Sequence, residues 1–217
     1  MRYTEEEYRK LVESCYPADF RADVLKGFVT AYRVAPDHCK RHFDEPDRHD
    51  VLGMTRRGRI HQEVRGVANR HKIDTRDEAN SIGSSHYLRL TSGRLNLIVC
   101  ATASPKTRIR RAVFREMLAI FNRDAQQDLN FVQQNDSEPP KGSRFLSVLI
   151  HAPRRGRRDQ PAFVDLVVPN KHLTGYICRI SLFKEFPNIA QDMLQRPTRV
   201  TAAKPYLRKR KDKATGE

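Results

Sequence analysis

Hydrophobic residues in the first third of the chain recur at helical spacing. An apolar stripe with a four-residue period predicts a helix over residues 18–35, which Pro36 would end. The stripe consists of Phe20, Val24, Phe28 and Tyr32. A capping box formed by Thr4 and Glu7 predicts a preceding helix that ends near Cys15. These two helices are expected to pack as an antiparallel pair.

The polar residues 37–50 interrupt this pattern and are expected to be irregular. A third helix, running to about His71, is then predicted by apolar residues that recur at intervals of three and four. These residues are Ile60, Val64 and Val67. The charged segment 71–86 that follows is expected to be a polar loop between this helix and the next element.

From residue 85 onward the apolar pattern alternates with a period of two, which is typical of half-buried strands. Residues 86–90 and 95–99 flank residues 91–94 and predict a β-hairpin in which Gly93 supplies a positive φ angle. Three further strands are predicted from runs of β-branched and aromatic residues. They cover residues 145–151, 163–168 and 176–183.

Between the hairpin and the later strands, a wide apolar face predicts one long packed helix. The helix would start near Pro105, and its apolar pattern continues to Val132. The buried face would be formed by Val113, Phe114, Met117, Leu118 and Phe121. A short closing helix is predicted over residues 188–195. No apolar periodicity follows Pro197, which is typical of a disordered tail.

Together these elements predict an α+β protein. An N-terminal helical segment would be followed by a mainly antiparallel five-stranded sheet, covered on one face and packed with the long helix, and by a disordered basic tail. The expected division is a slightly acidic helical segment over 1–50, a basic α+β body over 51–195 and a tail over 196–217. A chain of 217 residues is long enough for one well-buried core.

The distribution of charge extends this picture from fold to function. The formal net charge is +15, yet residues 1–50 carry 9 basic and 11 acidic side chains, so the positive excess lies beyond residue 50. It gathers in four runs: Arg56, Arg57 and Arg59; Arg108, Arg110 and Arg111; Arg154, Arg155, Arg157 and Arg158; and Arg208, Lys209, Arg210 and Lys211. Such clusters repel each other unless a polyanion neutralises them, so DNA or RNA is the expected partner. The acidic N-terminal helices would leave a separate face for a protein partner.

The run at 154–158 falls between two predicted strands, so its arginines would project from a hairpin tip without a packing role. The string Pro153-Arg154-Arg155-Gly156-Arg157 resembles the Arg-Gly-Arg centre of an AT-hook, a short extended segment that enters the minor groove of AT-rich DNA. The second proline of that motif is missing here. The resemblance implies that this run contacts nucleic acid.

Arg108, Arg110 and Arg111 would lie in the first turn of the long predicted helix. The helix dipole disfavours cations at this end by about 0.3–1 kcal/mol each. A phosphate bound at the helix N-terminus would compensate for this cost. Acidic side chains from elsewhere in the fold would do so as well.

One group of titratable residues is a candidate for catalysis. It consists of His71, Asp74, Asp77, Glu78 and His86. Carboxylates and histidines of this kind hold a divalent ion and activate water in metal-dependent nucleases. The spacing matches neither a His-Asn-His finger nor the pattern of restriction-type nucleases, and the alternative is an ordinary polar loop.

A second group offers the ligand types of a zinc site, namely His38, Cys39, His42 and His49. His38 and Cys39 are neighbours in sequence, and the backbone would have to bend sharply for both to reach one tetrahedral ion. We therefore expect no metal site and no cofactor, apart from Mg²⁺ if the segment 71–86 is catalytic.

The cysteines and the apolar runs predict the compartment. The four cysteines are widely spaced and form no Cys-x-x-Cys pair, so they are interpreted as reduced thiols. The first 14 residues are charged, and no run approaches the roughly 20 apolar residues that cross a bilayer. The expected location is the cytoplasm or another reducing intracellular compartment, without a membrane partner.

The leading interpretation is a nucleic-acid-binding protein whose arginine clusters contact the phosphate backbone. One alternative is a metal-dependent nuclease that uses the segment 71–86. Another is a structural component of a ribonucleoprotein assembly, which the basic tail would suit. Binding is favoured over catalysis, because the spacing of the residues in segment 71–86 matches neither nuclease pattern. The sequence also contains no Walker A loop, Gly-x-Gly-x-x-Gly string or Gly-x-Ser-x-Gly elbow, so it gives no support for a nucleotide-binding fold or an α/β-hydrolase.

Overall fold

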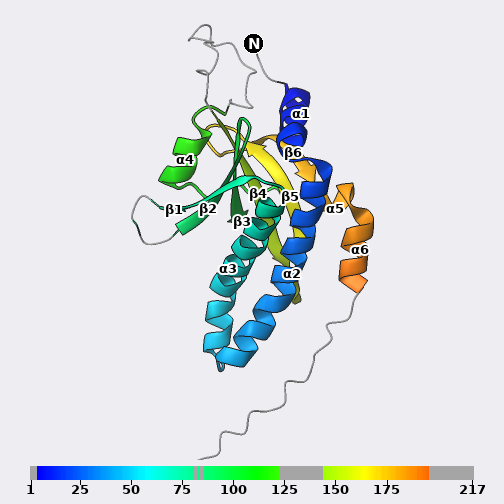
Figure 1. Cartoon of the computed structure of the whole chain (residues 1–217). Coiled ribbons are helices and arrows are strands. Elements are labelled where there is room, and N and C mark those ends of the chain that lie inside the picture. Colours follow the sequence, from blue (N-terminus) through cyan, green and yellow to red (C-terminus); the bar gives the residue numbers. More distant parts are fainter. Residues whose placement is uncertain (1–3, 81–82, 84–85, 123–143, 196–217) are drawn as a thin grey trace, which may run out of the picture.

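The computed structural model describes residues 4–80, 83, 86–122 and 144–195 of the chain (Figure 1). The helices described there are α1 (Glu5–Cys15), α2 (Ala18–His42), α3 (Asp47–Arg70), α4 (Val113–Ala119), α5 (Leu182–Glu185) and α6 (Pro187–Gln195). The strands are β1 (Asp74–Ala79), β2 (His86–Ser92), β3 (Leu95–Ala101), β4 (Phe145–Arg154), β5 (Arg157–Pro169) and β6 (Tyr176–Ser181). The α+β class is confirmed.

The first helix begins as its sequence predicts. The Thr4 hydroxyl accepts a hydrogen bond from the Glu7 amide, and the Glu7 carboxylate accepts one from the Thr4 amide, which completes the capping box. The second helix does not end at Pro36, so this prediction was wrong. Ala35 and Cys39 are fully buried and continue the apolar stripe past the proline. Their burial offsets part of the cost of about 3 kcal/mol that proline imposes on a helix interior.

The helix that pairs with α2 is α3, and the predicted pairing of α1 with α2 was wrong. α3 begins at Asp47, inside the segment that was expected to be irregular, and runs antiparallel to α2 (Figure 1). The two helices approach closely at Gly27, where an added Cβ atom would lie 3.2 Å from Cβ of Glu63. α1 packs instead against β6.

The six strands form one sheet in the order β1-β2-β3-β4-β5-β6. All neighbouring pairs are antiparallel except β3 and β4, which run parallel from Leu95 beside Phe145 to Ala101 beside His151. The predicted β2–β3 hairpin is confirmed, with Gly93 at φ 51°. The sheet is mixed and has one strand more than the five predicted. The additional strand is β1, whose polar composition suits a sheet edge.

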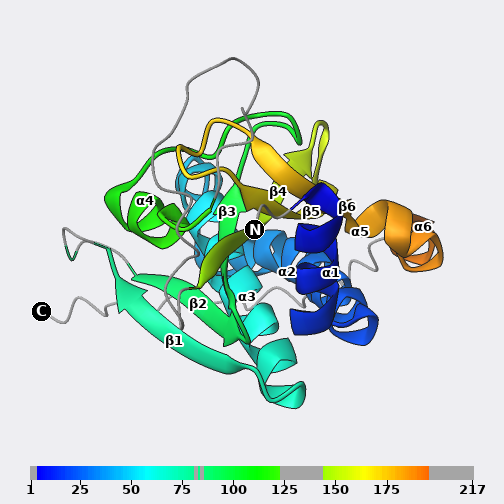
Figure 2. The same ribbon diagram turned by 90° about the horizontal axis from the view of Figure 1, so that it is seen from above.

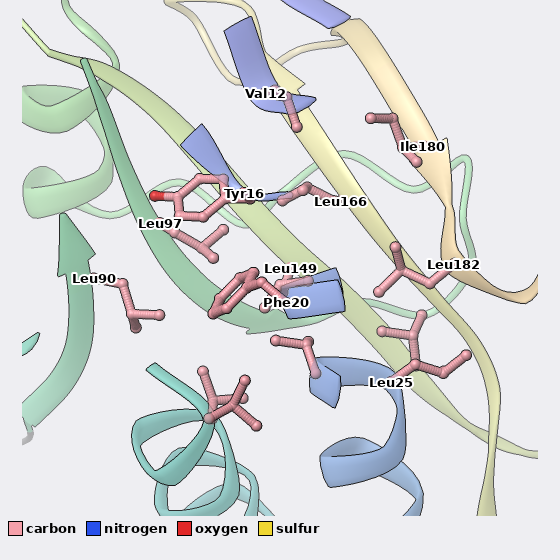
Figure 3. Close-up of a cluster of buried hydrophobic side chains, with 14 of the residues drawn as sticks. Val12, Tyr16, Phe20, Leu25, Leu90, Leu97, Leu149, Leu166, Ile180 and Leu182 are labelled. Atoms are coloured by element: carbon pink, nitrogen blue, oxygen red, sulfur yellow. The ribbon is translucent and has the colours of Figure 1, made fainter. Parts of the chain in front are cut away.

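The sheet separates two hydrophobic cores, so both of its faces are covered, whereas one covered face was predicted. Figure 3 shows part of the larger core, in which helical residues such as Val12 and Phe20 meet strand residues such as Leu97 and Leu149. On the opposite face, Ile98 and Ile150 pack with residues that include Phe114 of α4. α4 accordingly lies apart from the three N-terminal helices in Figures 1 and 2.

The helix α4 differs from its prediction. It was expected to start near Pro105 but begins at Val113, and the predicted continuation to Val132 lies outside the described residues. Val113 and Met117 were expected to be buried but are 57% and 69% exposed. Two other residues of the predicted face, Phe114 and Leu118, do pack against the sheet.

The closing helix is confirmed as α6, and the predicted tail over residues 196–217 lies outside the described residues. The four cysteines are buried free thiols. Within the part of the chain that the structure describes, none of the helices has the length and apolar character needed to cross a bilayer.

Replacing Gly27 with leucine should destabilise the fold by about 1–3 kcal/mol, because the new side chain must separate α2 from α3. Gly58→Leu is the matched control, since nothing lies within 4 Å of a Cβ atom added at Gly58 in α3. The control should be neutral or slightly stabilising through its higher helix propensity. Urea unfolding measures both variants, and equal stabilities would show that the approach at Gly27 is not tight.

Candidate functional site

The parallel pairing of β3 and β4 brings the ends of both strands to the same edge of the sheet. A cleft of about 560 Å³ lies at this edge. Its lining includes Cys100 and Ala101 from the end of β3 and His151 and Pro153 from the end of β4. The rest comes mainly from α3 and from the segment 110–115, which leads into α4. Because α3 and α4 pack on opposite faces, these two contributions reach the cleft from opposite sides of the sheet.

Five arginines line this cleft. Arg56 and Arg57 come from α3, and Arg110, Arg111 and Arg115 come from the start of α4 and the segment before it. The fold therefore brings together two of the basic runs that are far apart in the sequence. None of the described residues that line the cleft is an aspartate or a glutamate.

Arg56 is the most buried of the five and is held by neutral partners. Its guanidinium carbon lies 4.7 Å from the centre of the Tyr32 ring, and its Nη2 donates a 2.9 Å hydrogen bond to the Arg158 carbonyl. Its Nε is buried without a hydrogen-bond partner. Burial lowers the pKa of Arg56, but an arginine keeps its charge in such surroundings. The side chain is thus a fixed cation that is not paired with any described carboxylate.

Backbone carbonyls hold two further arginines. Arg57 donates to the carbonyl of His86, and Arg115 donates a 2.6 Å hydrogen bond to the carbonyl of Arg110. The Nε of Arg115 is also buried without a partner. A carbonyl orients a guanidinium group and satisfies one donor but leaves the positive charge in place.

Among the described residues, one cleft arginine is paired with an acid. This is Arg111, whose Nε lies 2.7 Å from Oε1 of Glu116. No described carboxylate oxygen lies within 4.0 Å of the other four, which are Arg56, Arg57, Arg110 and Arg115. Arg56 and Arg115 are partly or fully buried, where water and salt screen the repulsion between cations less than at an open surface.

Two histidines in the cleft are held uncharged. Burial, and then Arg57, lowers the pKa of His61 to about 4. Burial, and then Arg56 and His61, lowers the pKa of His151 to about 3. Nδ1 of His151 lies 2.8 Å from the hydroxyl of Tyr32, whose own pKa is raised by burial. Near neutral pH the cleft therefore owes its positive charge to the arginines alone.

The aromatic rings of the cleft are engaged within the protein. Tyr87 and Phe114 stack with their ring centres 4.1 Å apart, and the Arg115 guanidinium lies 5.0 Å from the centre of Phe114. The Tyr87 hydroxyl donates a 2.6 Å hydrogen bond to Glu78. With the Tyr32 ring beneath Arg56, the cleft presents guanidinium groups more than ring faces.

The third basic run lies at the tip of the β4–β5 hairpin, as its position between two predicted strands indicated. This hairpin also adjoins the cleft. Arg154 pairs with Arg157 across the turn, and Gly156 takes φ 76°. The carbonyl that holds Arg56 belongs to Arg158, so this hairpin and the cleft are directly connected. The tip is a hairpin and lacks the extended conformation that the AT-hook resemblance implied.

Not every predicted basic residue reaches the cleft. Arg59 and Arg108 are not among the residues that line it. The expectation that residues 108–111 form the first turn of a helix was wrong, because α4 has its N-cap at Ala112. The run at 208–211 lies outside the described residues.

Three residues that define the cleft were not predicted from the sequence. Tyr32 follows the apolar stripe of α2 and was therefore assigned to the core alone. His151 is a lone histidine in the apolar strand β4, and Arg115 follows Arg111 by four residues. The lone histidine and the additional arginine are visible in the sequence, but only the fold shows that both side chains line the cleft.

The residues considered for catalysis do not converge. Since residues 74–79 form a strand, Asp77 and Glu78 point to opposite faces of the sheet. Asp77 pairs with Arg65 at 2.7 Å, and Glu78 pairs with Arg89 at 2.6 Å. The other candidates are also dispersed: His71 lies 3.3 Å from Asp23, Asp74 lies 3.5 Å from Arg76, and His86 is exposed at the start of β2.

The possible zinc ligands are likewise not assembled. The rings of His38 and His42 lie 4.5 Å apart on α2, while the fully buried Cys39 is part of the interior and His49 contacts Arg158. In the described ranges, no three or more His, Cys, Asp or Glu side chains are arranged to hold a metal ion.

A second cavity, of about 520 Å³, involves α1, β6 and α5. Its charged lining residues are Arg9, Glu13, Arg179, Lys184 and Glu185. Here cations and carboxylates alternate, and Arg179 also pairs with the buried Asp165 at 2.7 Å. The cleft at β3 and β4 differs because none of the described residues that line it is acidic.

Comparisons of the chain with protein-family models, with curated proteins and with solved structures found no match. The function has to be inferred from the cleft itself.

Acidification should destabilise the protein through His151. The folded state keeps this imidazole neutral to about pH 3, whereas the unfolded chain binds the proton near pH 6.5. The unfolded state therefore binds more protons between these values, and stability falls as the pH falls below 6.5. Between about pH 7 and about pH 5 this linkage is worth about 2 kcal/mol. The acid-induced loss should be smaller by that amount in His151→Gln.

Urea unfolding of the wild type and the variant at both pH values measures this difference. His86→Gln, which changes an exposed histidine outside the cleft, serves as the control and should behave as the wild type does. A His151→Gln protein that loses as much stability on acidification as the wild type would contradict a neutral, buried His151.

Proposed function

We propose that the protein binds nucleic acid through its phosphate groups and that the arginine cleft at the ends of β3 and β4 is the main contact. The observation that supports this proposal is the convergence of five arginines on one cleft whose described lining contains no carboxylate. Partly buried cations without counter-charges reduce the stability of the folded state. A ligand that brings negative charge removes this cost when it binds.

Phosphate matches the donors that the cleft offers. A guanidinium group has five N–H donors in a planar fork that fits phosphate oxygens. Arg57 and Arg115 each use one nitrogen to reach a backbone carbonyl, which leaves further N–H groups for a ligand. The carbonyl contacts hold the side chains in place beforehand, so less conformational entropy is lost on binding.

The exposed arginines of the β4–β5 hairpin would extend this contact. The hairpin meets the cleft at Arg56, so a strand bound in the cleft can continue along the tip. Phosphate contacts carry no sequence information, and we expect little preference for particular bases. The proposal includes both DNA and RNA, because both backbones carry the same phosphate. A protein partner for the acidic α1 stays a prediction.

Replacing Arg57 and Arg110 together by glutamine should weaken nucleic-acid binding by roughly tenfold or more at about 0.1 M salt, because two charge-assisted contacts are lost. The dependence of affinity on salt should also become shallower, since fewer counterions are released. Both side chains are exposed, so folding should be unaffected. Fluorescence anisotropy with a labelled oligonucleotide across a salt series measures both quantities.

The matched control is Arg70→Gln/Arg76→Gln, which removes the same charge from exposed positions outside the cleft. If binding depended on net charge alone, the two double variants would lose affinity equally. The proposal requires that the control lose about twofold or less.

The hairpin provides a separate test. Changing Arg154, Arg155, Arg157 and Arg158 to alanine should reduce affinity and flatten the salt dependence. The fold should remain intact, because Arg56 is held by the backbone carbonyl of residue 158, which the substitution keeps. Thermal unfolding checks the fold, and the same anisotropy series checks binding. Unchanged affinity at moderate salt would remove the hairpin from the binding surface.

A further inference from the structure

The cleft holds more positive charge than an internal phosphate of a nucleic-acid strand can balance. Four of its arginines lack a carboxylate partner among the described residues, and its two histidines add no charge near neutral pH. An internal phosphodiester carries one negative charge and two unbridged oxygens. A phosphate at a strand end is a monoester with a charge of about −1.5 to −2 and three acceptor oxygens. The monoester matches the charge of the cleft more closely.

The size of the cleft favours the same ligand. Its volume of about 560 Å³ lies in the range of pockets that enclose a single ligand of small-molecule size. An internal phosphate has a nucleotide on each side, so a strand bound through it must enter and leave the site. A strand end inserts its terminal phosphate while the remainder of the strand stays outside.

The aromatic rings of the cleft are engaged by protein groups, which favours a phosphate ligand over stacked bases. Sites that bind internal single strands stack successive bases on free aromatic faces. In this cleft Arg56 lies over the Tyr32 ring, and Phe114 is engaged by both Tyr87 and Arg115. The groups available to a ligand are mainly guanidinium N–H donors.

We propose that the cleft binds a phosphomonoester, the terminal phosphate of a nucleic-acid strand, in preference to internal phosphodiesters. This inference rests on the proposed nucleic-acid binding and specifies the ligand of its main site. Arg57 from α3 and Arg110 from the other side of the sheet would contact the phosphate directly. The more buried Arg56 and Arg115 would add charge behind them.

The test uses one short single-stranded oligonucleotide, as DNA and as RNA, in three versions. The first has a 5′-phosphate, the second a 3′-phosphate and the third hydroxyl groups at both ends. One phosphorylated version should bind the wild type at least about tenfold more tightly than the hydroxyl version. This gain should fall to about twofold or less in Arg57→Gln/Arg110→Gln and should persist in Arg70→Gln/Arg76→Gln.

The outcomes separate the inference from the proposed function. If the three versions bind the wild type equally and the cleft variant weakens all of them, nucleic-acid binding stands and end recognition is overturned. A gain that survives in the cleft variant would also overturn it, because the end would then be recognised elsewhere. If none of the versions binds, the proposed function itself fails.

Competition with the corresponding nucleoside monophosphate distinguishes the two sources of a phosphomonoester. The strand-end proposal requires that the mononucleotide compete more weakly than the phosphorylated oligonucleotide, because the strand also contacts the hairpin arginines. A mononucleotide of equal affinity would make the free nucleotide the ligand and would overturn the strand-end assignment.

Discussion

The parallel pairing of β3 with β4 is the constraint on which the candidate site depends. Antiparallel neighbours send the chain back and forth across the sheet, whereas a parallel pair requires a crossover. The described part of this crossover contains α4, which packs on the face opposite α2 and α3. Both strands consequently end at one edge, where β3 leads toward Arg110 and Arg115 and β4 leads toward the basic hairpin. α3 supplies Arg56 and Arg57 at the same edge. One crossover thus gathers three basic runs that the sequence keeps apart.

Three of the cleft arginines are held by groups that leave their positive charge in place. An aromatic ring and a backbone carbonyl fix Arg56, and carbonyls fix Arg57 and Arg115. Carboxylates would hold the same side chains more strongly, but they would also neutralise the field that attracts an anion. The second cavity illustrates this difference, because its arginines and lysine are accompanied by Glu13 and Glu185. Neutral supports thus combine a fixed geometry with a net positive charge.

The sequence was informative where the evidence for an element was local. The capping box at Thr4, the β2–β3 hairpin around Gly93 and the hairpin at 154–158 depend on a few consecutive residues, and all three occur in the structure. Long-range relations were not accessible. The apolar stripe of α2 continues past Pro36 because α2 pairs with α3, and β1 forms from a polar segment because β2 offers it an edge. In the cleft, the sequence indicated the basic runs at 56–59 and 108–111 but could not show that they converge. Tyr32 and His151 gain a role only through that convergence.

Because the two cleft histidines are neutral, the positive charge of the cleft does not change with pH near neutrality. Arginine keeps its proton throughout the physiological range, so the attraction of the cleft for an anion does not depend on a titrating group near neutral pH. His61 and His151 contribute shape and hydrogen-bonding atoms but no charge there. A proton added to His151 would place a further cation next to Arg56 in the interior, where the repulsion is poorly screened. Acid therefore weakens the fold around the cleft before it strengthens the attraction for an anion. Because they are buried beside arginines, these histidines lower the stability of the fold in acid. The guanidinium groups keep the charge of the cleft constant.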